Sequence, residues 1–119
     1  MRLSLAAWAL ALAAFLNVPA FAQQTTGTVL GRVLDAQGSA IPGASVTARN
    51  GSTGFVRSVV SDTEGAYRLN ALPVGEFGIS VELAGFSTID RKGIVVNVGQ
   101  TITLDFSLKV ASEIGRAHV

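Results

Sequence analysis

The stretch that decides the fold is Phe77-Gly78-Ile79-Ser80-Val81-Glu82-Leu83, in which large apolar residues occupy every second position. A period of two is typical of a β-strand with one face buried and the other in solvent. Similar alternation recurs on both sides of this stretch, and turn signals rich in glycine separate the runs. We expect strands over residues 28–35, 44–49, 55–61, 67–70, 77–83, 87–98 and 101–108. The sequence therefore predicts an all-β, seven-stranded antiparallel sandwich of the transthyretin-like or immunoglobulin-like type.

The turns between these strands use glycine and aspartate. Glycine adopts a positive φ without strain, and an aspartate side chain accepts hydrogen bonds from backbone N–H groups nearby in sequence. We assign structural roles in turns to Asp35, Gly38, Gly43, Asp62, Gly65, Gly75 and Gly85. Pro42 cannot donate a ladder hydrogen bond and marks an edge or a connection.

Residues 87–92 are polar and predict an edge strand, which continues to Val98 after a bulge at Gly93. Arg91 and Lys92 are interpreted as solvated charges that keep this edge from aggregating. Gly99-Gln100 fits a two-residue hairpin loop, so we expect residues 101–108 to return beside that strand.

Large side chains on the inward faces predict the core. The expected core residues are Val46, Val59, Tyr67, Leu69, Phe77, Ile79, Val81, Phe86, Leu104 and Phe106. Tyr67, Phe77 and Phe86 could instead stack on a sugar, but their alternating or turn positions favour the core. Because the chain has no cysteine, this core must hold the fold without disulfide bonds.

The first 22 residues are interpreted as a helical secretory signal peptide. Arg2 gives the positive start, residues 3–16 are apolar apart from one serine, and small residues stand at positions 20 and 22. We expect cleavage between Ala22 and Gln23, with an uncleaved anchor as the alternative. The apolar run is shorter than the roughly 20 residues that span a bilayer, so no transmembrane segment is expected in the mature chain.

After the signal peptide we expect a polar leader over residues 23–26, the domain over 27–110 and a tail over 111–119. Residues 113–119 differ in style from the domain. They can be encoded by a common sequencing-adapter oligonucleotide read in frame. We therefore expect residues 113–119 to be an artefact and the natural product to be longer.

Catalytic chemistry has few candidates in this sequence. His118, the single histidine, lies in the tail, so a Ser-His-Asp triad or a Cys/His zinc site has no residues to use within the domain. Asp62 and Glu64 are a paired-carboxylate candidate, but turn chemistry explains them better, and they do not fit the twelve-residue calcium loop. The net charge of +1 gives no basic footprint for nucleic acid. We expect no catalytic, cofactor or metal site.

The pattern of glycine and aspartate residues at the turns resembles that of the carboxypeptidase regulatory-like domain over about residues 27–109. The resemblance lies in the order and spacing of several motifs, each of which is weak alone. They are Gly31-Arg32-Val33-Leu34-Asp35 with Gly38, Ile41-Pro42-Gly43-Ala44-Ser45-Val46, Ser61-Asp62-Thr63-Glu64-Gly65-Ala66-Tyr67-Arg68-Leu69, Leu72-Pro73-Val74-Gly75 and Val81-Glu82-Leu83-Ala84-Gly85-Phe86. In this family the peptidase chemistry belongs to a neighbouring domain, and nothing in this chain matches the zinc ligands of that domain.

The resemblance implies a non-catalytic accessory and interaction module. A signal peptide followed by such a domain is similar to the start of a TonB-dependent outer-membrane receptor. We therefore expect an N-terminal fragment of such a receptor, located in the periplasm or on the periplasmic face of the outer membrane. Its expected partners are other domains of the same receptor and periplasmic proteins. The alternative is a free-standing secreted carbohydrate-binding or adhesion domain, although no constellation of residues for a glycan is evident.

Overall fold

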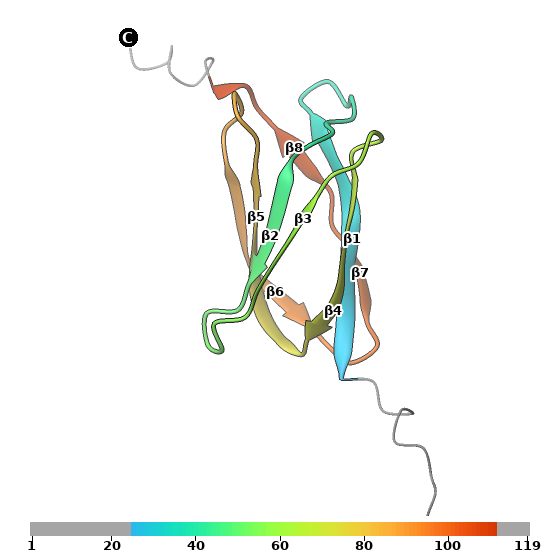
Figure 1. Cartoon of the computed structure of the whole chain (residues 1–119), viewed down its shortest axis with the longest axis vertical. Coiled ribbons are helices and arrows are strands. Elements are labelled where there is room, and N and C mark those ends of the chain that lie inside the picture. Colours follow the sequence, from blue (N-terminus) through green and yellow to red (C-terminus); the bar gives the residue numbers. More distant parts are fainter. Residues whose placement is uncertain (1–24, 112–119) are drawn as a thin grey trace, which may run out of the picture.

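Eight β-strands make up the computed structural model, which describes residues 25–111 (Figure 1). They are β1 (Thr26–Asp35), β2 (Ser45–Arg49), β3 (Val56–Val60), β4 (Ala66–Pro73), β5 (Gly75–Glu82), β6 (Ile89–Val96), β7 (Thr101–Thr103) and β8 (Phe106–Leu108). The expected all-β sandwich is confirmed, with eight strands rather than seven. The predicted cleavage between Ala22 and Gln23 and the predicted artefact at 113–119 lie outside the described residues.

The strands form two stacked sheets. The first sheet has the order β4-β1-β7, and β8 also pairs with β1. The second sheet has the order β3-β2-β5-β6. Strand β1 is therefore central in the first sheet, with β4 on one side and β7 and β8 on the other. Neighbouring strands are antiparallel except for β7 and β8, which run parallel to β1.

The hairpin predicted at Gly99-Gln100 is wrong. The chain does turn there, but β7 pairs with β1 in the first sheet, whereas β6 belongs to the second sheet. The turn itself is tied to β1, because Gly99 N–H donates to the Thr26 carbonyl and Thr28 N–H donates to the Gln100 carbonyl, both at 2.9 Å. Both sheets bury one face, so the chain can cross between them and keep its apolar residues inside. Alternation fixes which face is buried, but it does not fix the neighbouring strand.

The additional strand arises because the expected run 101–108 is split at Leu104 and Asp105. Leu104 N–H still donates to the Leu30 carbonyl at 2.8 Å. The Leu104 carbonyl, however, accepts a hydrogen bond from the Tyr67 hydroxyl. Arg32 N–H donates instead to Oδ1 of Asp105, at 2.9 Å. The N–H of Arg32 on β1 is thus bound by a side-chain carboxylate and not by a backbone carbonyl of the neighbouring strand. This interruption of the backbone pairing separates β7 from β8.

The core fills the space between the sheets. Of the residues expected there, Val59, Phe86 and Leu104 are only partly buried and pack against the core from its margin, while the other seven are buried. Further buried apolar residues are Val29, Val33, Ile41, Ala44, Ala48, Leu72, Val96 and Leu108. The ring of Phe77 meets the ring of Phe55 edge-on, with 6.1 Å between their centroids. This contact links β5 to the segment that enters β3.

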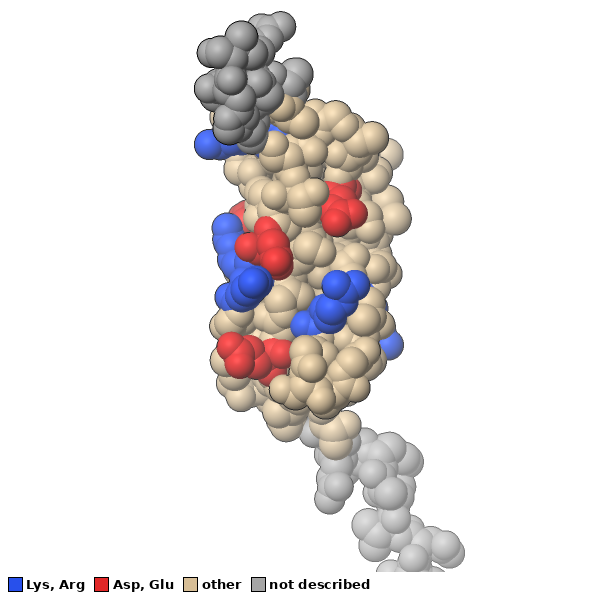
Figure 2. Space-filling model, turned by 90° about the vertical axis from the view of Figure 1, so that its left-hand side faces the viewer, with Lys and Arg blue, Asp and Glu red and all other residues tan. Residues whose placement is uncertain are grey.

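Strand β6 is an edge strand with a bulge, as the sequence predicted. The register against β5 shifts between Phe77 and Ile79, and Gly93 has a φ of 76°. Charged residues of both signs are interspersed on the side of the molecule where β5 lies (Figure 2). The interpretation of Arg91 as a purely solvated charge needs correction, because its guanidinium lies 5.1 Å from the ring centroid of Phe106 and covers the open side of the sandwich.

Candidate functional site

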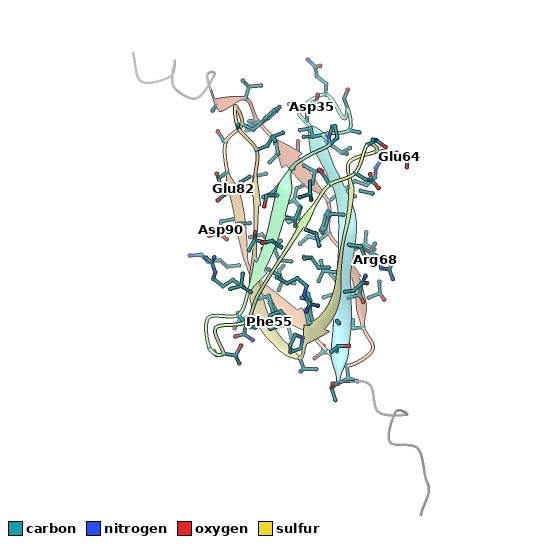
Figure 3. All side chains as sticks on the ribbon, viewed as in Figure 1. Asp35, Phe55, Glu64, Arg68, Glu82 and Asp90 are labelled. Carbon is teal, nitrogen blue, oxygen red and sulfur yellow. The ribbon has the colours of Figure 1, made fainter. Side chains whose placement is uncertain are left out.

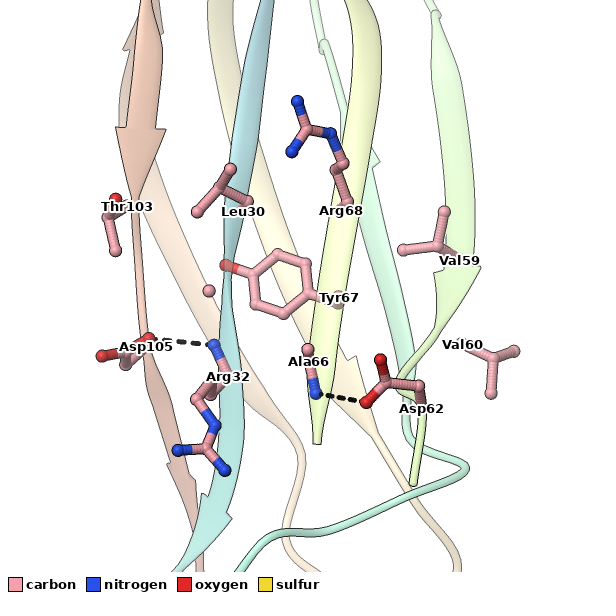
Figure 4. Close-up of a pocket in the computed structure, with 11 residues that line it drawn as sticks. Leu30, Arg32, Val59, Val60, Asp62, Ala66, Tyr67, Arg68, Thr103 and Asp105 are labelled. Atoms are coloured by element: carbon pink, nitrogen blue, oxygen red, sulfur yellow. Dashed lines mark hydrogen bonds between the residues drawn. The ribbon is translucent and has the colours of Figure 1, made fainter. Parts of the chain in front are cut away.

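A hollow over the outer face of the first sheet is the candidate site. It measures about 730 Å³ and is lined mainly by β1, β4, the β7–β8 junction and the end of β3. The side chain of Arg68 projects from β4 away from the sandwich interior (Figure 3). Leu30 lies on β1 between Arg68 and Thr103, its neighbours on the two flanking strands (Figure 4). The hollow therefore has an apolar centre surrounded by charged and hydroxyl groups.

The charged groups of the hollow form hydrogen bonds that support the fold. Nε and Nη2 of Arg32 donate to the Glu64 carbonyl at 3.3 and 2.9 Å. Asp105 accepts the Arg32 backbone N–H, as described above (Figure 4). Nε of Arg68 donates to Oδ1 of Asn70 at 2.7 Å, and its terminal nitrogens extend over the hollow (Figure 4). Arg68 is thus the cation of this site that is best placed to meet a ligand.

Asp62 lies at one end of the hollow, in the turn between β3 and β4. Its Oδ1 accepts the N–H groups of Glu64 and Ala66, each at 2.9 Å. Glu64 does not line the hollow with Asp62, so these two carboxylates do not form a paired acid–base site there. Asp35 has the corresponding role in another turn, where its Oδ1 accepts from Gln37 and Ser39 at 2.9 Å.

The other residues assigned to turns lie in loops or at strand ends away from the centre of the hollow. Gly38, Gly43, Gly65, Gly75 and Gly85 all have a positive φ. At Gly65 a side chain is also excluded by space, because a Cβ atom would lie 2.5 Å from the Val33 carbonyl oxygen. The tight turn after Asp62 can therefore pack directly against β1.

Tyr67 is buried beneath the hollow. Its hydroxyl donates to the Leu104 carbonyl, and its ring lies 5.9 Å from that of Phe106. Burial raises the pKa of the Tyr67 hydroxyl well above its ordinary value of 10.0; the charge of Asp105 raises it further, and Arg91 opposes the shift. A protonated tyrosine held in this way joins β4 to the β7–β8 junction. Phe77 is buried as well, and Phe86 is half-buried.

Arg57 is a residue that the sequence analysis missed. It donates through Nη1 to the carbonyls of Asn70 and Ala71, the latter at 3.2 Å. Its guanidinium also lies 5.2 Å from the ring centroid of Phe55. The register of β4 against β1 shifts beside these carbonyls, and Ala71 has a φ of 55°, so a bulge directs both oxygens to one cation. The alternation of residues 55–61 could have revealed the inward position of Arg57, because Arg57 lies on the same strand face as Val59, which was expected in the core.

This geometry suits binding better than bond cleavage. The carboxylates of the hollow hold backbone N–H groups, and Tyr67 holds a carbonyl oxygen. Within residues 25–111, no cluster of three or more His, Cys, Asp or Glu residues could hold a metal ion. The same part of the chain contains no helix that is long and apolar enough to cross a membrane.

Comparison with known proteins matches this architecture to a family. The model of the carboxypeptidase regulatory-like domain matches residues 28–109. The TonB-dependent transporter Oar of Myxococcus xanthus is 35% identical over 91 residues, which cover 75% of this chain and only 8% of that transporter.

Solved structures with the same fold have diverse functions. A proposed carbohydrate-binding protein from Bacteroides uniformis has a TM-score of 0.57 at 21% identity, covering 70% of this chain and 41% of that chain. Catechol 1,2-dioxygenase from Pseudomonas arvilla C-1 has a TM-score of 0.59 at 14% identity, covering 77% of this chain and 54% of that chain. At these identities the likeness shows the fold alone.

Proposed function

Because the chain belongs to the carboxypeptidase regulatory-like domain family, we propose that it is a non-catalytic periplasmic module of a TonB-dependent outer-membrane transporter. The observation that carries this proposal is the similarity to the Myxococcus xanthus transporter, which extends over three quarters of this chain. The matched region is a small part of that transporter, as expected of an accessory module in a much longer protein.

The proposed mechanism is structural. The sandwich is well connected, because β1 is paired on both sides and arginines from β3 and β6 link its two sheets at the open sides. Such a body can present an edge or a surface hollow to another domain or to a periplasmic protein. The carboxylates of Asp62 and Asp105 and the hydroxyl of Tyr67 are already hydrogen-bonded to backbone atoms, which supports a role in recognition without chemistry.

Cell fractionation tests this proposal. An antibody raised against the purified domain should detect a species several times heavier than the 12.3 kDa chain, and this species should sediment with the outer membrane. A protein of about the size of the domain in the culture medium would overturn the proposal and favour the free-standing secreted domain. Titration of that secreted protein with a panel of glycans would then test the carbohydrate-binding alternative.

A further inference from the structure

The second sheet ends at β3, which has a free backbone edge. Among the described strands, β3 pairs with β2 alone. Asn50 N–H donates to the Phe55 carbonyl and Ser61 N–H donates to the Ala44 carbonyl, both at 2.9 Å. Because hydrogen bonding alternates along an antiparallel strand, Arg57 and Val59 then bond to β2. Val56, Ser58 and Val60 direct their N–H and carbonyl groups away from the sheet.

This edge lacks most of the features that normally prevent pairing with another strand. Its register against β2 is continuous over five residues, and its sequence VRSVV contains no proline, glycine or lysine. Val56 is 49% exposed and Val60 is 66% exposed. The one charged side chain, Arg57, binds carbonyls of β4 instead of facing an incoming strand. A free, regular, β-branched edge is a template for an additional strand.

There is also space beside this edge. Val59 and Val60 line the same hollow as Leu30 and Arg68. A strand added to β3 would direct every second side chain towards this hollow, where the guanidinium of Arg68 is available, and the side chains between them to the opposite face, where they can pack beside valines of β3. The backbone edge and the side-chain surface therefore lie together, which is the arrangement that strand addition requires.

The charge of this region indicates what the added strand should carry. Strands β2 and β3 contain Arg49 and Arg57 and no acidic residue. The hollow itself has Arg32 and Arg68 against Asp62 and Asp105. Asp105 accepts the Arg32 backbone N–H and the Arg32 guanidinium binds the Glu64 carbonyl, so Arg68 is the cation that remains to meet an incoming strand. Asp62 lies beyond the end of β3, and its Oδ1 is occupied by backbone N–H groups. A second copy of this chain is a poor occupant, because pairing β3 with β3 would bring two sets of arginines together. An acidic strand would instead offset this positive charge.

We propose that the free edge of β3, with the hollow beside it, binds an extended segment of a partner protein in which β-branched apolar residues alternate with acidic residues. This inference rests on the proposed function and deepens it by naming the edge and the chemistry of the partner. The added segment would extend the second sheet beyond β3. Its backbone would pair with Val56, Ser58 and Val60, and its carboxylates would lie near Arg68.

A capped synthetic peptide, Thr-Val-Asp-Val-Glu-Val-Thr, tests the proposal. The full chain is expressed with its N-terminal segment, purified after processing by the cell, and titrated with the peptide while amide hydrogen exchange is followed by NMR. Exchange at Val56, Ser58 and Val60 should slow, and amides of β6 should not change. Affinity should fall as salt is added. The same peptide with lysine in place of Asp and Glu should bind at least about tenfold more weakly.

Three variants test whether the peptide binds at the edge of β3 or elsewhere on the molecule. Ser58→Pro removes an outward N–H and should weaken peptide binding by about tenfold or more. Arg68→Glu should weaken binding of the acidic peptide and strengthen binding of the lysine peptide. A variant that was merely unfolded would not show this reversal. Lys92→Glu, on the opposite edge, is the matched control and should leave both affinities unchanged.

The opposite results would overturn the proposal. These are equal binding of the acidic and lysine peptides, binding of neither peptide, protection of β6 amides, or dimerisation of the free chain through β3. Fractionation of the native protein is independent of these measurements. An outer-membrane species without peptide binding would therefore refute this inference alone, whereas a small secreted species would refute the proposed function.

Discussion

The two edges of the second sheet differ in how they meet solvent. Strand β6 has eight residues, a bulge at Gly93 and the charged run Asp90-Arg91-Lys92. Strand β3 has five residues, an uninterrupted register and exposed valines. Bulges and charges are standard protections of sheet edges, so one edge is protected and the other is open. This difference is the basis of our proposal that the edge of β3 accepts a strand from a partner.

The largest loss of stability is expected at Phe77, a side chain next to both edge strands of the second sheet. Phe77 is fully buried on β5, beside β6, and its ring contacts Phe55 next to β3. Phe77→Ala should lower the free energy of unfolding by about 3–5 kcal/mol. Leu104→Ala should cost less, because Leu104 is only partly buried. Chemical denaturation of both variants measures the difference, and equal losses would show that Phe77 does not hold the two edges.

Arg57 and Arg91, which link the two sheets at opposite sides of the sandwich, should contribute unequally to the free energy of unfolding. Arg57→Met removes charged hydrogen bonds to two carbonyls and should cost about 1–2 kcal/mol. Arg91→Met removes a contact with the face of Phe106 and should cost about 0.5–1 kcal/mol. Thermal unfolding compares them, with Lys109→Met as a surface control. A larger loss of stability for Arg91→Met than for Arg57→Met would show that the sheets are held together more tightly on the β6 side than on the β3 side.

Tyr67 provides a test that depends on pH. Tyr67→Phe removes the hydrogen bond to Leu104 and should cost about 1 kcal/mol at neutral pH. The folded state keeps the hydroxyl proton where the unfolded chain releases it, since the folded pKa lies above 10.0. Wild-type stability should therefore be fully present below about pH 10 and fall as the pH rises further, a loss that the phenylalanine variant lacks.

Alkaline titration reads this group directly. Tyr67 is the single tyrosine of the chain, so ultraviolet absorbance of tyrosinate reports on it alone. Parallel stability curves for the wild type and the phenylalanine variant above pH 10 would contradict the buried state of this hydroxyl.

The smallest effect on stability is expected at the exposed valines. Val60→Lys on β3 and Val95→Lys on β6 replace side chains that are 66% and 55% exposed. Each should change the free energy of unfolding by no more than about 0.5 kcal/mol. Chemical denaturation of both variants checks these values. A loss of more than about 1 kcal/mol at either valine would show that its side chain is packed and that its edge is less exposed than described.

The sequence predicted the inward faces of the strands and the turns well, because both depend on local chemistry. Alternation placed Phe77 and Leu69 in the core, and the turn chemistry of aspartate and glycine placed Asp62 in its turn. It could not predict that β7 crosses to the other sheet, because that choice depends on contacts with Thr26 and Thr28, distant in the chain. The hollow was also beyond reach, since its lining comes from strands that are not neighbours in sequence.

The parallel pairing of β7 and β8 with β1 has a consequence for assembly. The bond between Arg32 and Asp105 joins residues 73 positions apart. The central strand therefore keeps one side unpaired until residues 101–108 have also reached the compartment in which the domain folds. Closing so long a loop slows folding. A chain that stops before Thr101 would leave β1 open on that side, and we expect it to be a substrate for chaperones and proteases.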